Sequence, residues 1–113
     1  MATITDEYMQ QILPSARVYS AVILKATPKR QEPGADKIIW EHARRNFSLR
    51  ADGLLSIVCP IADESDVRGV SIFNTSIEEA KKIMDEDPAV LAGVLTYEVH
   101  VCRGFPGDSL PTG

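Results

Sequence analysis

The chain lacks the features that mark two large classes of binding protein. It contains 12 Lys and Arg against 16 Asp and Glu, which gives a formal net charge of -4 at pH 7. Binding to a phosphate backbone needs a basic surface, so we expect no nucleic-acid partner. The longest apolar runs cover only residues 21–24 and 90–95, far short of the ~20 residues of a membrane-spanning helix, so we expect no membrane partner.

Cysteine is also scarce, and no secretory signal is visible. The two cysteines, Cys59 and Cys102, have no CxxC spacing and no His-rich neighbourhood. Their apolar, strand-like surroundings favour buried free thiols over a zinc site or a disulfide. Asp6 and Glu7 lie where a signal peptide carries positive charge, and no apolar segment follows them. These features predict a cytoplasmic protein.

Motifs of the common catalytic machineries are absent as well. The sequence has no GxSxG elbow, no P-loop, no GxGxxG and no HExxH. Its two histidines, His42 and His100, and its scattered carboxylates show no metal-ligand spacing, so we expect neither a metal nor a cofactor. His100 falls on the polar side of the last predicted strand, where it suits a dimer interface better than a cavity.

What is present suits one soluble domain, because 113 residues with 44% hydrophobic and 25% charged side chains form a single core. Hydrophobic periodicity and capping residues divide the chain into helices and strands. The predicted elements are a helix at residues 5–13, a strand at 17–26, a helix at 35–51, strands at 54–61 and 70–74, a helix at 77–86 and a strand at 94–103. After the leading helix, this is the βαββαβ order of an α+β, ferredoxin-like sandwich with an antiparallel sheet.

The same division predicts three parts: a helical extension at residues 1–15, the ferredoxin-like domain at 16–103 and a Gly/Pro-rich tail at 104–113. In such a domain the helices cover one face of the sheet only. The first strand nevertheless carries apolar residues on both sides, with Val18, Val22 and Leu24 alternating with Tyr19 and Ile23. An apolar face left in water marks an interface, so we expect a homodimer that associates through the open face of the sheet.

His42 is expected to face the interior of the protein. On a helical wheel it lies in the apolar arc with Ile38, Asn46 and Leu49, away from the charged arc. An inward histidine can be a catalytic group, although it is more often a hydrogen-bonded core residue. The wheel alone leaves both interpretations open.

The run Asp85-Glu86-Asp87-Pro88 breaks a local rule. Three carboxylates at a helix C-terminus oppose the helix dipole and one another, which predicts raised carboxyl pKa values and suggests a site. The alternative is a set of solvated surface charges. Pro88 is expected to end the helix and to force Asp87 into an extended conformation, which turns its side chain away from the helical register.

Several of these residues together resemble the YCII-related family of small proteins. The resemblance spans residues 17–103 and lies in His42, in Gly53-Leu54-Leu55, in Pro60 and Ile61, in Ser76-Ile77-Glu78-Glu79-Ala80, in Asp87-Pro88, and in Gly93 and Tyr97-Glu98-Val99. It implies a dimeric α+β barrel whose active site pairs a helix-borne His with the Asp of the Asp-Pro pair, here His42 and Asp87. The family usually has Gly-Pro where this chain has Cys59-Pro60, and the leading helix and the tail lie outside the match.

These observations lead to a predicted site and function. His42 and Asp87 are the expected catalytic residues, and Asn46, Cys59 and Pro60 are the expected contacts to substrate. A His beside a carboxylate can take and give a proton at neutral pH, so we expect a small metal-free enzyme that isomerises a small organic molecule, eliminates a group from it or hydrolyses it. One alternative is a non-catalytic dimer that binds a small metabolite or a protein partner through the same cavity. Another is a structural interaction module, in which His42 and Asp87 lie far apart or are each hydrogen-bonded to the backbone.

Overall fold

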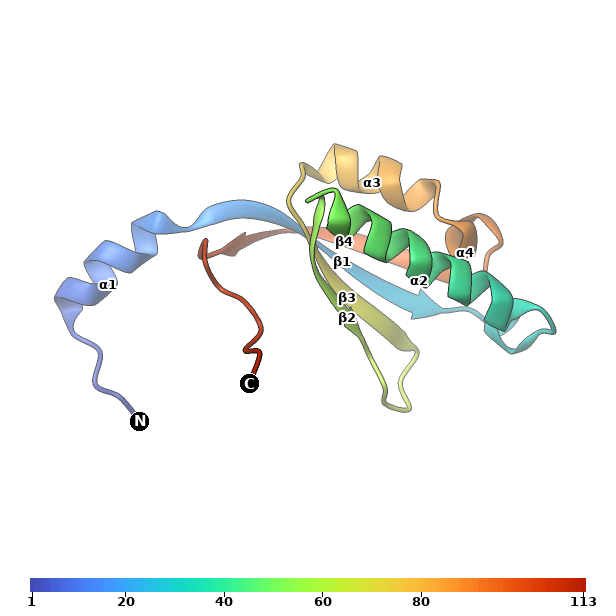
Figure 1. Ribbon diagram of the computed structural model, residues 1–113, viewed down its shortest axis with the longest axis horizontal. Coiled ribbons are helices and arrows are strands. Elements are labelled where there is room, and N and C mark those ends of the chain that lie inside the picture. The colour runs from blue at the N-terminus through green and yellow to red at the C-terminus, as the bar shows by residue number, and fades with distance from the viewer.

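The computed structural model describes residues 1–113 and contains one four-stranded antiparallel sheet with helices packed on it (Figure 1). The helices are α1 (Asp6–Ile12), α2 (Ala35–Ala51), α3 (Ile77–Asp85) and α4 (Pro88–Leu91), and two 3-10 turns are η1 (Leu13–Ser15) and η2 (Pro28–Gln31). The strands are β1 (Arg17–Ala26), β2 (Leu55–Pro60), β3 (Val67–Phe73) and β4 (Leu95–Gly104). This content confirms the expected α+β class.

The sheet has the order β2-β3-β1-β4, and every neighbouring pair is antiparallel. β1 is therefore an inner strand between β3 and β4, and β2 and β3 form the expected hairpin. In Figure 1, α2, α3 and α4 all lie on the same side of the sheet. The arrangement is compatible with a ferredoxin-like fold.

Alternate residues of β1 supply the centre of the core. Val22 and Leu24 are 0% and 3% exposed, and they belong to one buried cluster with Ala80 and Met84 of α3 and Phe73 of β3. A period of two in the strand and of three to four in the helix selects these positions. The covered face of the sheet is thereby defined by the even-numbered residues of β1.

The other face of the sheet carries no helix. Ile23 of β1 pairs with Val70 of β3, and Ala21 pairs with Ile72, which in turn pairs with Ile57 of β2. All five are apolar side chains that stay partly exposed. We call these five residues the open face. Ile23 lies on an inner strand, near the centre of this surface.

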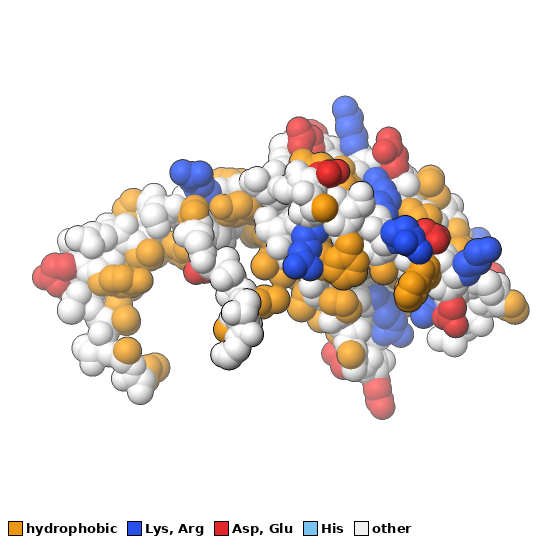
Figure 2. Space-filling view, in the orientation of Figure 1, with side chains coloured by type: hydrophobic (Ala, Val, Ile, Leu, Met, Phe, Trp, Pro, Cys, Tyr) orange, Lys and Arg blue, Asp and Glu red, His pale blue; other side chains and the backbone are white.

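A narrow arm extends from the rest of the molecule (Figure 1). We define the arm as residues 1–19 and 101–113, which comprise α1, η1, the paired ends of β1 and β4, and the C-terminal tail, and the body as residues 20–100. The chain measures 56 × 30 × 24 Å along its principal axes, and α1 contains no buried residue. Figure 2 shows apolar groups along the arm, which carries eight of the eleven exposed large hydrophobic side chains. These are Met1, Ile4, Tyr8, Met9, Leu13, Val18, Val101 and Leu110.

The element boundaries agree with the sequence prediction to within one residue except at the start of β3, and one short helix, α4, was not expected. β3 begins at Val67 rather than Val70, because Gly69 pairs with both Pro60 of β2 and Leu24 of β1, and the pairing with β1 continues to Val67. Pro88 was expected only to end the preceding helix, but it has a second role. It is the first residue of α4, where its fixed φ and its missing N–H suit the N-terminal position.

The expected burial of the two cysteines is wrong. Both cysteines are free thiols, as expected, but Cys59 is exposed and Cys102 is partly exposed. Cys59 pairs with Val70 and Cys102 with Tyr19, so both side chains fall on the side of the sheet that no helix covers. Val18 is 65% exposed because the first residues of β1 run beyond the helices into the arm.

Candidate active site

α2 places His42 and Asn46 one turn apart on its inward side. The helix runs for 17 residues, and its buried residues are Ala35, His42 and Asn46. Separations of seven and four residues put these side chains on one stripe of a helix. The expected inward orientation of His42, which is 8% exposed, is therefore confirmed.

Asp87 lies in the link between α3 and α4. Its backbone is extended (φ -67°, ψ 134°), as expected for a residue before proline, and its carboxylate caps α4 by accepting a hydrogen bond from the Ala89 N–H at 2.9 Å. The side chain is fully buried. Asp87 is thus the favourable N-cap of the following helix, and the expected repulsion at a helix C-terminus does not apply to it.

The structure brings His42 and Asp87 together. His42 Nδ1 lies 2.9 Å from each carboxylate oxygen of Asp87, although the residues are 45 positions apart in the chain. Burial is the largest influence on the pKa of Asp87 and raises it, but the hydrogen bond and charge of His42, the Ala89 N–H and the charge of Arg45 together lower this pKa below its ordinary value of 3.8. The expectation of a raised carboxyl pKa is therefore wrong for Asp87, which is ionised at neutral pH.

Arg45 adds a positive charge beside this pair. Its Nη1 lies 3.6 Å from Asp87 Oδ1, and its Nη2 lies 4.0 Å from Glu86 Oε2. Nη1 is buried without a hydrogen-bond partner, so its contact with Asp87 is electrostatic. Arg45 was not expected at the site, and no local signal could have found it, because the helical wheel places it in the polar arc with Lys37 and Arg44.

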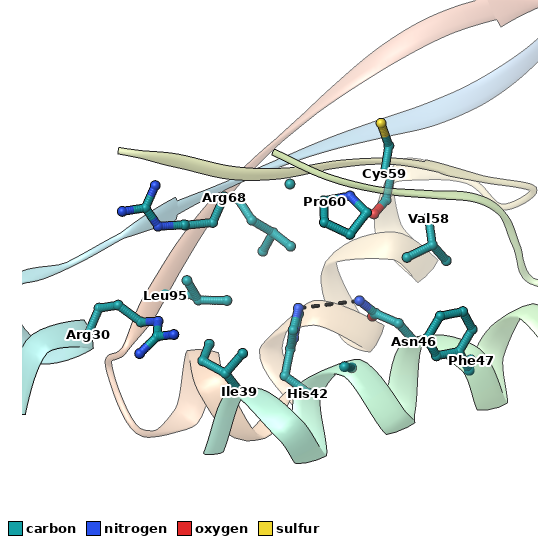
Figure 3. Close-up of a pocket in the computed structure, with 14 residues that line it drawn as sticks. Arg30, Ile39, His42, Asn46, Phe47, Val58, Cys59, Pro60, Arg68 and Leu95 are labelled. Atoms are coloured by element: carbon teal, nitrogen blue, oxygen red, sulfur yellow. Dashed lines mark hydrogen bonds between the residues drawn. The ribbon is translucent and has the colours of Figure 1, made fainter. Parts of the chain in front are cut away.

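The second ring nitrogen of His42 faces Asn46. His42 Nε2 is 3.3 Å from Asn46 Nδ2, as the dashed line in Figure 3 marks. With the amide nitrogen as donor, Nε2 is the acceptor, and the ring proton lies on Nδ1, which donates it to Asp87. The network thus selects one neutral tautomer, whose electron pair on Nε2 points away from Asp87 and accepts the Asn46 N–H.

His42 and Asn46 border a cavity of about 190 Å³ between α2 and the sheet (Figure 3). Fourteen residues line the cavity, seven of them hydrophobic. Pro60 is among them, so the structure places it beside His42 and Asn46 as the prediction requires. Cys59 borders the cavity too, but Figure 3 shows its sulfur pointing away from the ring of His42. Of Cys59, the main chain and not the thiol faces the cavity.

Arg30 and Arg68 also line the cavity, although neither was expected there from the sequence. Arg30 belongs to η2 and Arg68 to β3. Only the tertiary fold brings these two segments to the same cavity as His42, and neither segment carries a local motif that indicates a ligand site. The role of these two residues could therefore not be predicted from the sequence.

The remaining polar residues that the sequence singled out lie outside the cavity. Tyr97 donates a hydrogen bond from its hydroxyl to Asp85 Oδ1 at 2.7 Å. Burial, and then the bond and charge of Asp85, raise the pKa of Tyr97 to about 12. Glu86 is exposed, in line with the alternative of a solvated charge. His100 Nε2 lies 3.2 Å from Glu98 Oε2 on the exposed side of β4.

Other structural features and comparisons with known proteins add little to this geometry. Nowhere do three or more His, Cys, Asp or Glu side chains come together as a set that could hold a metal ion. None of the helices combines the length and the apolar character that crossing a membrane requires.

A scan against known protein families gives no match, and a search of curated proteins finds none either. The function must be inferred from the site itself.

Proposed function

We propose that the chain is a YCII-related protein of ferredoxin-like topology and that it catalyses acid-base chemistry on a small organic molecule. In this proposal His42 transfers the proton, and Asp87 orients its ring. The observation that carries the proposal is the buried 2.9 Å contact between His42 Nδ1 and the Asp87 carboxylate. With Nδ1 engaged there, Nε2 is the nitrogen that serves a substrate in the adjacent cavity, once the substrate replaces the Asn46 amide as its hydrogen-bond partner.

In the reaction, the neutral His42 ring acts first as a base. Nε2 accepts a proton from a C–H bond, a hydroxyl or a water molecule, and the electron pair of the broken bond stays on the carbon or oxygen. Asp87 fixes the orientation of the ring and stabilises the imidazolium that forms, while Arg45 favours the ionised form of Asp87. The ring then returns the proton to another atom or to a leaving group. This sequence serves isomerisation, elimination and hydrolysis alike.

A non-catalytic module that binds a small metabolite or a protein partner is the second candidate. The contact between Asn46 Nδ2 and His42 Nε2 at 3.3 Å favours it, because both ring nitrogens then have hydrogen bonds before any ligand arrives. In such a module His42 is a fixed part of the cavity wall. The two functions differ in the effect of replacing His42, which abolishes turnover in an enzyme and only weakens binding in a module.

We also propose that the protein is a homodimer that associates through the open face. Its five partly exposed apolar residues lie on three adjacent strands, and soluble monomers rarely leave such a continuous surface in water. A second sheet packed on this face forms the dimeric barrel that the resemblance implies, and it also covers the Cys59 side chain. The apolar groups of the arm offer the partner a further contact.

Deuterium exchange tests the enzymatic proposal with a panel of candidate substrates. The protein is incubated in D₂O with small oxo acids and lactones, and proton NMR follows the loss of carbon-bound hydrogen. A base at His42 predicts exchange at an acidic C–H position that slows by about 10²- to 10⁴-fold in His42→Gln. His100→Gln is the matched control, because His100 lies outside the cavity, and we expect it to keep the wild-type rate.

The exchange rate of Asp87→Asn tests the orienting role of Asp87 in the same experiment. An amide no longer stabilises the imidazolium and disturbs the tautomer, so exchange should slow by a comparable factor. Equal rates in wild type and His42→Gln, or neither exchange nor lactone hydrolysis with any compound, contradict the enzymatic proposal. If His42→Gln weakens only the binding of a compound that never exchanges, the protein is a binding module.

A further inference from the structure

The permanently charged side chains that line the cavity beside His42 are all positive. Arg30 and Arg68 are its permanently charged lining residues, and no Asp or Glu lines it. The whole chain has a net charge of -4, so this local excess of positive charge runs against the composition. A concave, partly apolar site with a cationic end favours an organic anion.

Both guanidinium groups keep donors free for a ligand. Arg30 Nη1 donates to Asp36 Oδ1 at 2.8 Å, but the Asp36 side chain is 94% exposed and water screens its charge. Arg68 Nη1 donates to the Ser65 carbonyl oxygen at 2.6 Å, and Arg68 forms no ion pair with a carboxylate. Each guanidinium has five N–H donors in a fork that matches a carboxylate, and these contacts engage a single nitrogen of each.

The positions of the lining residues predict the orientation of a bound ligand. Figure 3 shows Arg30 and Arg68 at one end of the cavity, Asn46 and Phe47 at the other, and His42 between them. A molecule with its anionic group at the arginine end therefore extends past the His42 ring. The cavity of about 190 Å³ slightly exceeds the ~150 Å³ of an apolar cavity that binds benzene. The body of the ligand is thus about the size of one six-membered ring.

We propose that the ligand of this cavity is a small organic carboxylate whose carboxylate group is held by Arg30 and Arg68. This inference rests on the proposed function, because it assigns a substrate class to the same site. It also fits the chemistry: removal of a proton from the carbon next to a carboxylate leaves negative charge on the carboxylate oxygens. Two guanidinium groups bound to those oxygens stabilise that charge as it develops.

Binding of benzoate, measured without turnover, tests the proposal. Benzoate and its neutral analogue benzamide are titrated into ¹⁵N-labelled protein and followed by NMR. We expect benzoate to shift the signals of residues that line the cavity, and benzamide to bind at least about tenfold more weakly. Arg30→Gln and Arg68→Gln should each weaken benzoate binding by about ten- to a hundredfold. The matched control is Arg44→Gln, because the Arg44 side chain is 66% exposed, bonds to Glu41 and lies outside the cavity.

Several outcomes overturn the proposal. They are equal affinities for benzoate and benzamide, no shift at the cavity in millimolar benzoate, an equal loss in Arg44→Gln, and tighter binding of inorganic phosphate than of benzoate. His42→Gln separates this inference from the proposed function, because it should keep benzoate affinity within a few-fold while it abolishes exchange. If benzoate binds at the two arginines and no compound exchanges in wild type, the catalytic proposal fails and the carboxylate site stands.

Discussion

The body and the arm of this molecule use their apolar residues in opposite ways. In the body, ten buried hydrophobic residues form one core, and the buried pair of His42 and Asp87 lies beside it. On the arm, eight large hydrophobic side chains are exposed, and α1 buries none of its residues. The core of the body is complete within one chain, whereas the large apolar side chains of the arm stay exposed in that chain.

This difference separates two kinds of property. Changes to buried groups of the body should alter the free energy of unfolding and the chemistry of the site, because these groups have no alternative partner in water. Changes to the arm or the open face should alter association between chains, because their apolar groups have few partners within the chain.

The largest expected effect follows from removal of the buried carboxylate. Asp87→Ala leaves Arg45 and a buried imidazole without their partner and removes the cap of α4, so the free energy of unfolding should fall by about 3–5 kcal/mol. Urea denaturation measures this change in the free energy of unfolding. Asp108→Ala on the arm is the matched control, because Asp108 is exposed, and its effect should stay within about 0.5 kcal/mol. A loss below about 1 kcal/mol in Asp87→Ala contradicts this account of the body.

The next effect concerns the open face. Ile23→Lys puts a charge near its centre, and burying that charge in a dimer interface should weaken association by at least about a hundredfold. The variant should still fold as a monomer, because Ile23 is partly exposed and pairs with the acidic Glu98 of β4. Sedimentation at micromolar concentration measures the oligomeric state of the variant. Leu91→Lys, at a site on α4 that is 72% exposed, is the control that should stay dimeric.

If wild-type protein sediments as a monomer at the same concentration, the open face is not an interface. The dimeric barrel that the resemblance implies is then also wrong, and the cavity beside His42 must be complete within one chain.

A smaller effect appears in the pH dependence of stability. The pKa of Asp87 is lowered by folding, so its stabilising contribution is fully present above the ordinary value of 3.8 and is lost as the pH falls through the folded value. The difference in free energy of unfolding between wild type and Asp87→Asn should therefore narrow as the solution is acidified from neutral pH to about pH 3. Asp63, whose pKa is lowered chiefly by its hydrogen bond with Ser65, is common to both proteins and cancels in the comparison. A difference that stays constant with pH contradicts the assignment.

The smallest effect is expected from removal of the leading helix. Deletion of residues 1–15 from Ile23→Lys should change the free energy of unfolding of this monomer by less than about 0.5 kcal/mol, because no residue of α1 is buried. Chemical denaturation of the two monomers provides the comparison. A loss above about 1 kcal/mol means that α1 packs on its own chain, which removes the distinction between body and arm.

Much of the fold could be predicted because its elements have strong local signals. β1 and α2 agree with the sequence prediction at both ends, since period two and period 3.6 dominate residues 17–26 and 35–51. The start of β3 could not be predicted, because Gly69 is typical of a turn and only its two neighbouring strands hold it in the sheet. α4 was missed for a related reason, since Pro88 signals both the end of one helix and the start of another.

The site was predictable only in part. His42 and Asn46 could be found from the helical wheel, and Asp87 from its unfavourable neighbours and the following proline. Arg30, Arg45 and Arg68 could not be assigned, because their long side chains reach the site from positions that a sequence pattern places in solvent. The acidic run was also misjudged, since the sequence does not show that Asp87 caps α4 and accepts a hydrogen bond from His42.

The tautomer of His42 tests the central claim most directly, because both the proposed base and the orienting role of Asp87 depend on it. ¹⁵N NMR of histidine-labelled protein distinguishes the protonated from the unprotonated nitrogen of the neutral ring. We predict that Nδ1 carries the proton and that Nε2, on the cavity side, carries none. A neutral ring with its proton on Nε2 contradicts the account, because Asp87 then accepts no hydrogen bond from His42 and Nε2 is no base.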